Sequence, residues 1–336
     1  MSRRLLLAFA AALALGDPAL AQDQTDYLAR AFNPAHPDLA RSAAVPAQLG
    51  NESYVDALAR LVYYWAYPAI DVTSRTSMWD LMKNGPGTMF GVGPGSPVNE
   101  SGCIASYLPP TQRIIVTPNS DTFYGEAFVD LGREPVVIQT PADVPAGHYW
   151  TMQIVDVFTN VVRQVGSASG TPGGKFLLVG PGWQGEKPDG FIDVIRLPTN
   201  YGAVLPRSFA TRTPEGKARA IAVQDQMGVY PLSKNTDGRK KFDCEANTRN
   251  AVYAGGVTAE LLAADPDVAR TQWVVPTRFW KDVERMLSLN PTVSPADTAM
   301  AEQARTLIAL GKSSAKWQAL LDQAARRFPR QGAAYV

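Results

Sequence analysis

The sequence predicts an α+β protein with an antiparallel β-sandwich or jelly-roll-like body, N-terminal helices and a C-terminal set of helices. Three observations predict this class. Residues 113–210 place apolar residues with a period of two, which is typical of strands. The stretches on either side place them at helical spacing. The 26 prolines and 27 glycines among 336 residues favour a fold with many turns. No strand–helix alternation of a parallel α/β sheet occurs in the period-two segment.

The first 21 residues have the pattern of a secretory signal. Arg3 and Arg4 supply a positive start, residues 5–15 form an apolar run, and residues 19–21 (ALA) form a small-residue cleavage site. The run is too short to cross a bilayer, and no later stretch reaches the required ~20 apolar residues. We therefore expect a periplasmic or secreted protein with no membrane span. The arginine pair also resembles a twin-arginine start, so either export route stays open.

Two helices are predicted near the N-terminus, after an extended arm. Residues 22–50 contain three separated prolines and little periodicity, which predicts the arm. A helix then begins at a cap, Asn51 or Ser53, and ends at Pro68. Residues 71–82 predict a second helix. The apolar stripe expected to reach the core is Leu58, Leu61, Val62 and Trp65.

The rest of the chain divides into predicted strands followed by predicted helices. The strands are residues 114–116, 123–129, 136–139, 150–157, 175–179 and 191–196. The helices are residues 215–227, 276–289, 295–310 and 315–328. The expected domain organisation is a signal peptide (1–21), an arm (22–50), a β-rich domain with flanking helices (51–290) and a C-terminal helical extension (291–336).

Charge and cysteine content restrict partners and compartment. The 32 basic and 31 acidic side chains nearly cancel, which argues against nucleic-acid binding. Cys103 and Cys244 are the only cysteines, and both follow the predicted signal. An oxidising compartment permits a bridge between them, which would restrict the unfolded chain by about 4 to 5 kcal/mol. Two separate buried thiols are the alternative.

Several known chemical signatures are absent. The glycines of residues 91–95 (GVGPG) follow no predicted strand and open no helix, so they do not form a dinucleotide-binding fingerprint. The chain has no P-loop and no G-x-S-x-G nucleophile motif. His36 and His148 are its only histidines, so we expect no metal and no cofactor.

Five short motifs, in this order, resemble those of the DUF1254 family: TPNSDTFY (117–124), QIVD with TNV (153–156, 159–161), FLLVGPGW (176–183), Arg196 with TN (199–200), and QDQ (224–226). The resemblance extends over about residues 55–290. It implies a β-sandwich-like body in a bacterial, often exported protein, and it implies no reaction. Family members often continue into a second β domain, DUF1214, which we expect this chain to lack.

The first two motifs each contain one aspartate, and the two lie on separate segments. Asn119 and Asp121 can each accept a hydrogen bond from the backbone amide two residues on, which predicts a stiff turn that holds Asp121 and Tyr124 at a strand entrance. Asp156 alternates with apolar residues on one face of a later strand. A buried, unpaired carboxylate costs several kcal/mol, so Asp156 is either exposed or paired. Candidate partners are Arg163, Arg196 and Arg207.

Two interpretations of these aspartates stay open. If Asp121 and Asp156 face each other, one can be held protonated as a general acid while the other acts as base. If backbone amides and arginines saturate both, they only brace the sandwich. The candidate catalytic residues are Asp121, Asp156, Tyr124 and His148. The candidate substrate-binding residues are Asn119, Asn160, Arg163, Arg196, Asn200 and Trp183; Trp183 would form an aromatic platform with Trp150, Tyr124 and Tyr201.

The sequence favours an acid/base enzyme, a hydrolase or lyase, that acts on a neutral or carbohydrate-like small molecule or glycan outside the cytoplasm. A non-catalytic ligand-binding module of the cell envelope is the first alternative. A structural or interaction protein is the second. A calcium ion at Asn119, Asp121 and Asp156 would suit oxygen ligands, but no known loop spacing supports it. The oligomeric state stays open.

Overall fold

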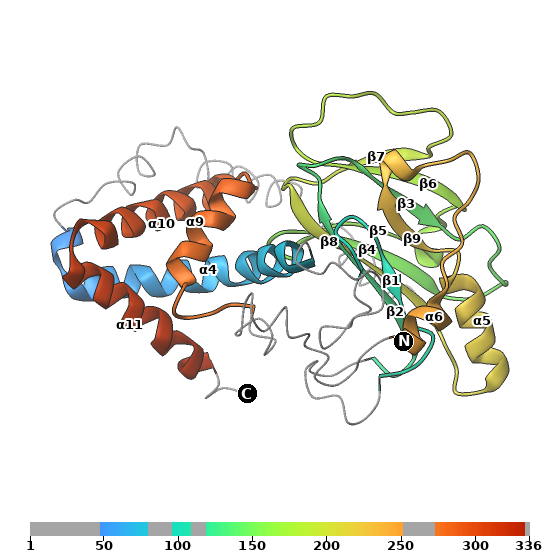
Figure 1. Ribbon diagram of the computed structural model, residues 1–336, viewed down its shortest axis with the longest axis horizontal. Helices are drawn as coiled ribbons and strands as arrows, with labels where there is room; N and C mark the ends of the chain where they lie inside the picture. The colour runs from blue at the N-terminus through green and yellow to red at the C-terminus, as the bar shows by residue number, and fades with distance from the viewer. Residues whose placement is uncertain (1–47, 80–95, 109–118, 251–272, 333–336) are drawn as a thin grey trace, which may run out of the picture.

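The computed structural model describes residues 48–79, 96–108, 119–250 and 273–332. The predicted signal peptide, most of the arm, the glycines at 91–95 and the predicted strand 114–116 lie outside these residues. Two β-sheets with helices α5 and α6 lie on one side of the molecule, and helices α9, α10 and α11 lie on the other (Figure 1). The long helix α4 runs from the helical side to the sheets (Figure 1).

The first sheet has five strands in the order β1-β2-β8-β4-β5, and every neighbouring pair is antiparallel. Its central strand β8 pairs with β2 on one side and with β4 on the other. Strands β5 and β8 were not among those predicted from the sequence. The bounds are β1 Gly102–Cys103, β2 Thr122–Asp130, β4 Trp150–Asp156, β5 Val161–Gly166 and β8 Tyr201–Phe209.

The second sheet has four strands in the order β7-β6-β3-β9. Its pairs are antiparallel, except that β6 and β7 run parallel. The bounds are β3 Val136–Thr140, β6 Gly174–Val179, β7 Asp193–Arg196 and β9 Gly228–Pro231. Three short 3-10 helices accompany the strands and the start of the described chain: η1 Gln48–Gly50, η2 Ser167–Ser169 and η3 Leu232–Lys234.

One apolar core fills the space between the two sheets. Met152, Ile154 and Val204 of the first sheet are fully buried in the same cluster as Ile138 and Leu178 of the second. Alternate residues of each strand point into this layer, as the period of two requires. The predicted sandwich is therefore confirmed, and within the described residues the two sheets do not close into a barrel.

Helix α4 (Glu52–Trp79) corrects the prediction of two separate N-terminal helices. The helix continues through Pro68, although proline removes one backbone donor and usually kinks or ends a helix. Buried residues continue on both sides of it, so packing outweighs the local cost. Asn51 caps the helix by accepting hydrogen bonds from two backbone amides. Leu61, predicted to be in the core, is 59% exposed, because the buried stripe runs through Val62 instead.

The C-terminal helices are α9 (Phe279–Leu289), α10 (Pro295–Ser313) and α11 (Ala315–Gly332), close to their predicted bounds. They bury aromatic and aliphatic side chains against α4, including Phe279, Leu307 and Phe328. The same cluster includes Phe128 and Val155 of the first sheet, so the helical core is continuous with one face of that sheet. None of the helices described is long and apolar enough to cross a membrane.

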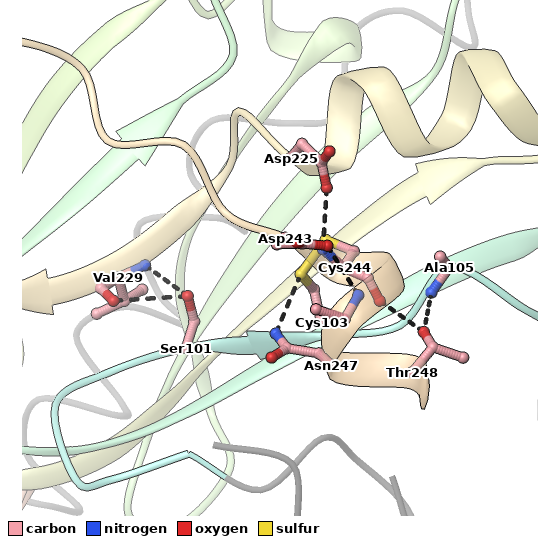
Figure 2. Close-up of a disulfide and its surroundings, with 10 residues drawn as sticks. Ser101, Cys103, Ala105, Asp225, Val229, Asp243, Cys244, Asn247 and Thr248 are labelled. Carbon is pink, nitrogen blue, oxygen red and sulfur yellow. Dashed lines mark hydrogen bonds between the residues drawn. A yellow bond between two sulfur atoms is a disulfide. The ribbon is translucent and has the colours of Figure 1, made fainter. Parts of the chain in front are cut away.

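A disulfide joins Cys103 of β1 to Cys244 at the start of α6 (Cys244–Asn250), as Figure 2 shows. Of the two alternatives for these cysteines, the disulfide is therefore correct and the separate thiols are not. Helix α5 (Pro214–Gln224), capped by Thr213, lies beside α6. The carboxylate of Asp225, just after α5, accepts a hydrogen bond from the backbone amide of Cys244 (Figure 2). The bridge thus fixes the segment after β9 to the edge strand of the first sheet.

Candidate functional site

The structure does not bring Asp121 and Asp156 together. The carbonyl of Asp121 accepts a hydrogen bond from the amide of Ala210, whereas Asp156 pairs with Gly202. Gly202 lies near the start of β8 and Ala210 directly follows its end, eight positions later, so the two aspartates are about 26 Å apart at the rise of a strand. The hypothesis of a facing acid/base pair is therefore wrong, and so is that of a shared calcium site.

Asp156 stabilises the turn between β4 and β5. Its side chain is almost fully buried and accepts hydrogen bonds from the backbone amides of Phe158 (2.9 Å) and Asn160 (3.0 Å) and from the Asn160 side chain (3.0 Å). Thr159, between them, has the positive φ of 66° that this tight turn requires. The hydrogen bonds of the Asp156 carboxylate are thus made within the turn, by backbone amides and the Asn160 side chain. This agrees with the interpretation in which Asp156 braces the sandwich.

The predicted turn at the entrance of β2 is confirmed for Asn119, whereas the predicted hydrogen bond to the Asp121 carboxylate is not found among the described residues. The side-chain oxygen of Asn119 accepts a hydrogen bond from the backbone amide of Asp121 at 3.1 Å. The amide of Asn119 donates in turn to the phenol oxygen of Tyr124 at 2.6 Å. Asp121 is exposed, and no described residue bonds its carboxylate. The turn therefore positions Tyr124, while Asp121 faces solvent.

Three predicted binding residues hold loops and sheet edges together. Arg163 of β5 forms an ion pair with Asp193 of β7 at 2.8 Å, which connects the edges of the two sheets. Arg196 donates to three backbone carbonyls between β6 and β7. Its guanidinium also lies 5.7 Å from the ring of Trp183. All three side chains have protein partners far from the entrance of β2.

Asn200 and the proposed aromatic platform also separate. The Asn200 side chain donates to the carbonyl of Leu289 and so connects the sheet to α9. Trp150 is buried between the sheets, and Tyr201 is buried in the helical core. With Trp183 in the loop after β6, the platform is not assembled.

His148, just before β4, is buried beside Ser208 of β8. Its Nε2 atom lies 2.9 Å from the Ser208 hydroxyl oxygen. Burial first, and then the charge of Arg219, lower the pKa of His148. Ser208 and Arg207 point to opposite faces of β8, so His148 and Tyr124 lie on different faces of the sheet.

The QDQ motif at 224–226 forms a structural junction. The side chain of Gln226 accepts from the amides of Ala142 and Asp143 and donates to the carbonyl of Asp143. Asp225 accepts from Cys244, as described above. Gln224 is fully buried, and neither of its amide atoms has a partner among the described residues.

One face of the first sheet carries a cluster of polar side chains that we call the polar row: Tyr124 and Glu126 of β2, Arg207 of β8 and Gln153 of β4. Tyr124 pairs directly with Arg207, and Gln153 pairs with Leu205, so all four side chains share a face. All four are part-buried. The apolar half of this face is covered by α4, and the polar row occupies the other half.

Glu126 has the most perturbed environment in the polar row. Burial is the largest cause that raises the pKa of its carboxyl group; the charge of Asp71 raises it further, and the charge of Arg75 opposes both. Asp71 and Arg75 lie on the C-terminal half of α4 and form an ion pair at 2.7 Å. The Arg75 guanidinium also lies 4.8 Å from the ring of Trp273, so it is held in place.

Two polar atoms on the same face have no hydrogen-bond partner among the described residues. The Nε atom of Arg207 and the hydroxyl of Thr122 are buried, and no described residue bonds them. Unsatisfied buried polar atoms are rare, because each costs about 1 to 3 kcal/mol. The Arg207 guanidinium lies 5.7 Å from the Tyr124 ring, which fixes its position. The face therefore offers a donor to an acceptor that is not part of the described chain.

Tyr124 is a site residue that was predicted from the sequence. Glu126, Gln153, Asp71 and Arg75 were not predicted as site residues. Glu126 stands two positions after Tyr124, so strand periodicity alone places both on one face. A charged residue at that position between apolar neighbours was the available signal. The contribution of α4 depends on tertiary packing.

Among the described residues, no group of three or more His, Cys, Asp or Glu side chains is arranged to hold a metal ion.

Residues 98–231 match the family described as "Protein of unknown function (DUF1254)". The match supports the resemblance found in the sequence, over a narrower range than expected. It begins before β1 and ends with β9, so the DUF1254 region contains all nine described strands and the polar row. Helix α4, with Asp71 and Arg75, lies outside it.

Two solved structures resemble the chain weakly. The VPA0106 protein from Vibrio parahaemolyticus is 21% identical with a TM-score of 0.41, over 77% of this chain and 60% of that one. A putative uncharacterized protein from Burkholderia cenocepacia is 11% identical with a TM-score of 0.28, over 85% of this chain and 62% of that one. The chain thus spans about three fifths of each. No curated protein matches it.

Proposed function

We propose that the polar row binds a small polar molecule and that Glu126 exchanges a proton with it, which makes the protein an acid/base enzyme of the hydrolase or lyase type. The observation that carries the proposal is the Glu126 carboxyl: it is part-buried, its pKa is raised, and no described residue hydrogen-bonds it. Catalytic carboxyl groups often have raised pKa values, because a group that retains its proton can act as a general acid. Glu126 replaces the Asp121 and Asp156 pair in this role.

Arg207 serves as the anchor of the bound molecule. Its Nε–H is buried without a partner among the described residues, so a ligand oxygen reaches it only when the side chain shifts, and that hydrogen bond then removes an unfavourable state of the free protein. Tyr124 fixes the guanidinium by stacking. The phenol oxygen of Tyr124 accepts from Asn119, which leaves its hydrogen free to donate to the same molecule. Carbonyl and hydroxyl oxygens of a neutral or carbohydrate-like molecule suit these donors.

Glu126 is the group that transfers a proton in the proposed hydrolysis. A protonated Glu126 donates its proton to the leaving oxygen as the bond to that oxygen breaks; a water molecule adds to the other atom of that bond and loses a proton, which restores the acid form of Glu126. The guanidinium of Arg75, on the adjacent helix, favours the charged form of Glu126, whereas Asp71 disfavours it. Burial and Asp71 therefore favour the acid form of Glu126, and Arg75 opposes them.

Non-catalytic ligand binding is the second candidate function. One observation favours it. In the described part of the chain, Asp71 is the only other carboxylate that affects the pKa of Glu126, and Asp71 forms an ion pair with Arg75, so it is not free to act as a base. A site with one free acid and no base or nucleophile can hold a ligand through hydrogen bonds alone. A purely structural role would leave the unpaired Arg207 donor unexplained.

We also propose that the protein is periplasmic or secreted. The pattern of residues 1–21 supports this, since it has the charged, apolar and small-residue parts of an export signal. The bridge between Cys103 and Cys244 supports it independently, because disulfides persist in oxidising compartments. Fractionation of cells that express the full chain tests the proposal: it requires the protein in the periplasm or medium, shortened by about 21 residues.

A thermal-shift screen of sugars, lactones and small hydroxy compounds tests the proposed site, because a ligand of the folded state raises the melting temperature. Compounds that stabilise the wild type are rescreened on Arg207→Gln and on Arg163→Gln, a matched control whose guanidinium pairs with Asp193 at the sheet edge. The shift should disappear in Arg207→Gln and persist in the control. A shift that persists in both variants contradicts the site. Turnover of a stabilising compound that Glu126→Gln abolishes separates the enzyme from the binding module.

A further inference from the structure

A hollow lies beside the N-terminal end of α5, apart from the polar row. It has a volume of about 180 Å³ and is lined by Ala146, Gly147, His148, Phe209, Thr211, Gly216 and Arg219. Gly216 is required at its wall: a Cβ atom there would lie 1.7 Å from the Thr211 hydroxyl oxygen. No residue of the polar row lines this hollow.

The hydrogen bond between His148 and Ser208 determines what His148 offers to the hollow. Ser208 is fully buried, and His148 Nε2 is the only described partner of its hydroxyl. A buried hydroxyl hydrogen needs an acceptor, so Ser208 donates and Nε2 accepts. The neutral ring then carries its hydrogen on Nδ1. Nδ1 has no partner among the described residues, and His148 lines the hollow, so Nδ1–H is the donor that His148 offers to it.

The hollow therefore presents donors and no carboxylate. Its polar lining side chains are the Nδ1–H of His148, the hydroxyl of Thr211 and the guanidinium of Arg219. The positive end of the α5 dipole adds to their field. This arrangement complements a negative charge.

We propose that this hollow binds a small carboxylate. At about 30 Å³ for each water-sized group, its volume holds roughly six non-hydrogen atoms, the size of acetate or a short hydroxy acid. The carboxylate lies between Arg219 and His148 Nδ1–H, and Thr211 donates to it. Phe209 is 39% exposed and gives the apolar part of the molecule a surface to pack on. The site shares no residue with the polar row, so either can fail alone.

Histidine NMR tests this site directly, because His36 and His148 are the only histidines. Protein labelled with ¹⁵N-histidine is titrated with sodium acetate at constant ionic strength, with sodium chloride as the balancing salt. The ring signals of His148 should show hydrogen on Nδ1 and move along a saturating curve. Arg219→Gln should weaken the apparent affinity about tenfold or more, since it removes a charged donor. Lys217→Gln, an exposed cation on the same helix outside the hollow, should not change it.

Three results would overturn the proposal. The first is a His148 signal with its hydrogen on Nε2. The second is a shift that grows linearly with acetate and to the same extent for His36, which indicates a bulk effect. The third is equal affinity in Arg219→Gln and Lys217→Gln, which removes the guanidinium from the site.

Discussion

The phenol ring of Tyr124 on β2 stacks against the guanidinium of Arg207 on β8, with the Arg207 Cζ atom 5.7 Å from the ring centroid. The two residues are directly paired in the antiparallel ladder, so their relative position depends on strand register and not on a loop. Arg207 keeps a buried donor unpaired in the described part of the chain. A site on paired strands is held more rigidly than one on loops.

Tyr124→Phe should keep the stacking but remove the acceptor of the Asn119 amide. We expect the free energy of unfolding to fall by about 1 kcal/mol, the usual net value of one hydrogen bond. Urea denaturation measures it. Tyr149→Phe is the matched control, because Tyr149 is 41% exposed and its hydroxyl has no partner among the described residues. Equal stability of both variants would show that the hydrogen bond contributes nothing.

Glu126→Gln should change the pH dependence of stability. The pKa of Glu126 is raised in the folded protein above its ordinary value of 4.5, so above that pH the unfolded chain loses a proton that the folded chain keeps. This contribution to stability is full below about pH 4.5 and is lost as pH rises through the folded pKa. The melting temperature of the wild type should therefore fall relative to that of Glu126→Gln as pH rises from 4 to 8. Parallel profiles would contradict the raised pKa.

Asp156→Asn and Asp121→Asn should behave differently. Asp156 is buried and accepts three hydrogen bonds in the β4–β5 turn, so its substitution should cost about 2 to 3 kcal/mol of stability. Asp121 is exposed and its carboxylate has no described partner, so its variant should stay within about 0.5 kcal/mol of the wild type. Chemical denaturation of both proteins measures the difference. A stable Asp156→Asn would contradict the turn.

Reduction of the Cys103–Cys244 bridge should destabilise the fold. The bridge spans 141 residues, and loss of a native disulfide costs about 2 to 5 kcal/mol. Thermal unfolding with and without dithiothreitol measures the loss. The double variant Cys103→Ser/Cys244→Ser should melt near the reduced wild type and should not respond to the reductant. A wild type that is insensitive to reduction would contradict a stabilising bridge.

Sequence periodicity predicted most strands and helices, because burial on one face places apolar residues at regular intervals in the sequence. The prediction failed where this periodic pattern is interrupted or short. Pro68 indicated a helix end, yet α4 continues because its buried stripe resumes after the proline. Strand β9 has only four residues and directly follows a helical segment, so its period could not be recognised.

For the candidate site, local sequence was sufficient only for local features. The Asn119 turn follows from a side chain and an amide two residues apart, and it was predicted correctly. Whether Asp156 meets Asp121 depends on which end of β8 each strand pairs with, and no local pattern contains that information. The contribution of Arg75 to the Glu126 environment depends on how α4 packs on the sheet.

The most direct test is a crystal structure of the protein with a compound that stabilises it in the thermal-shift screen. The proposed site predicts an oxygen atom of the compound within hydrogen-bonding distance of Arg207 Nε, with a polar group facing Glu126. A compound bound elsewhere, with the Arg207 donor still unpaired, would contradict the assignment of function to the polar row.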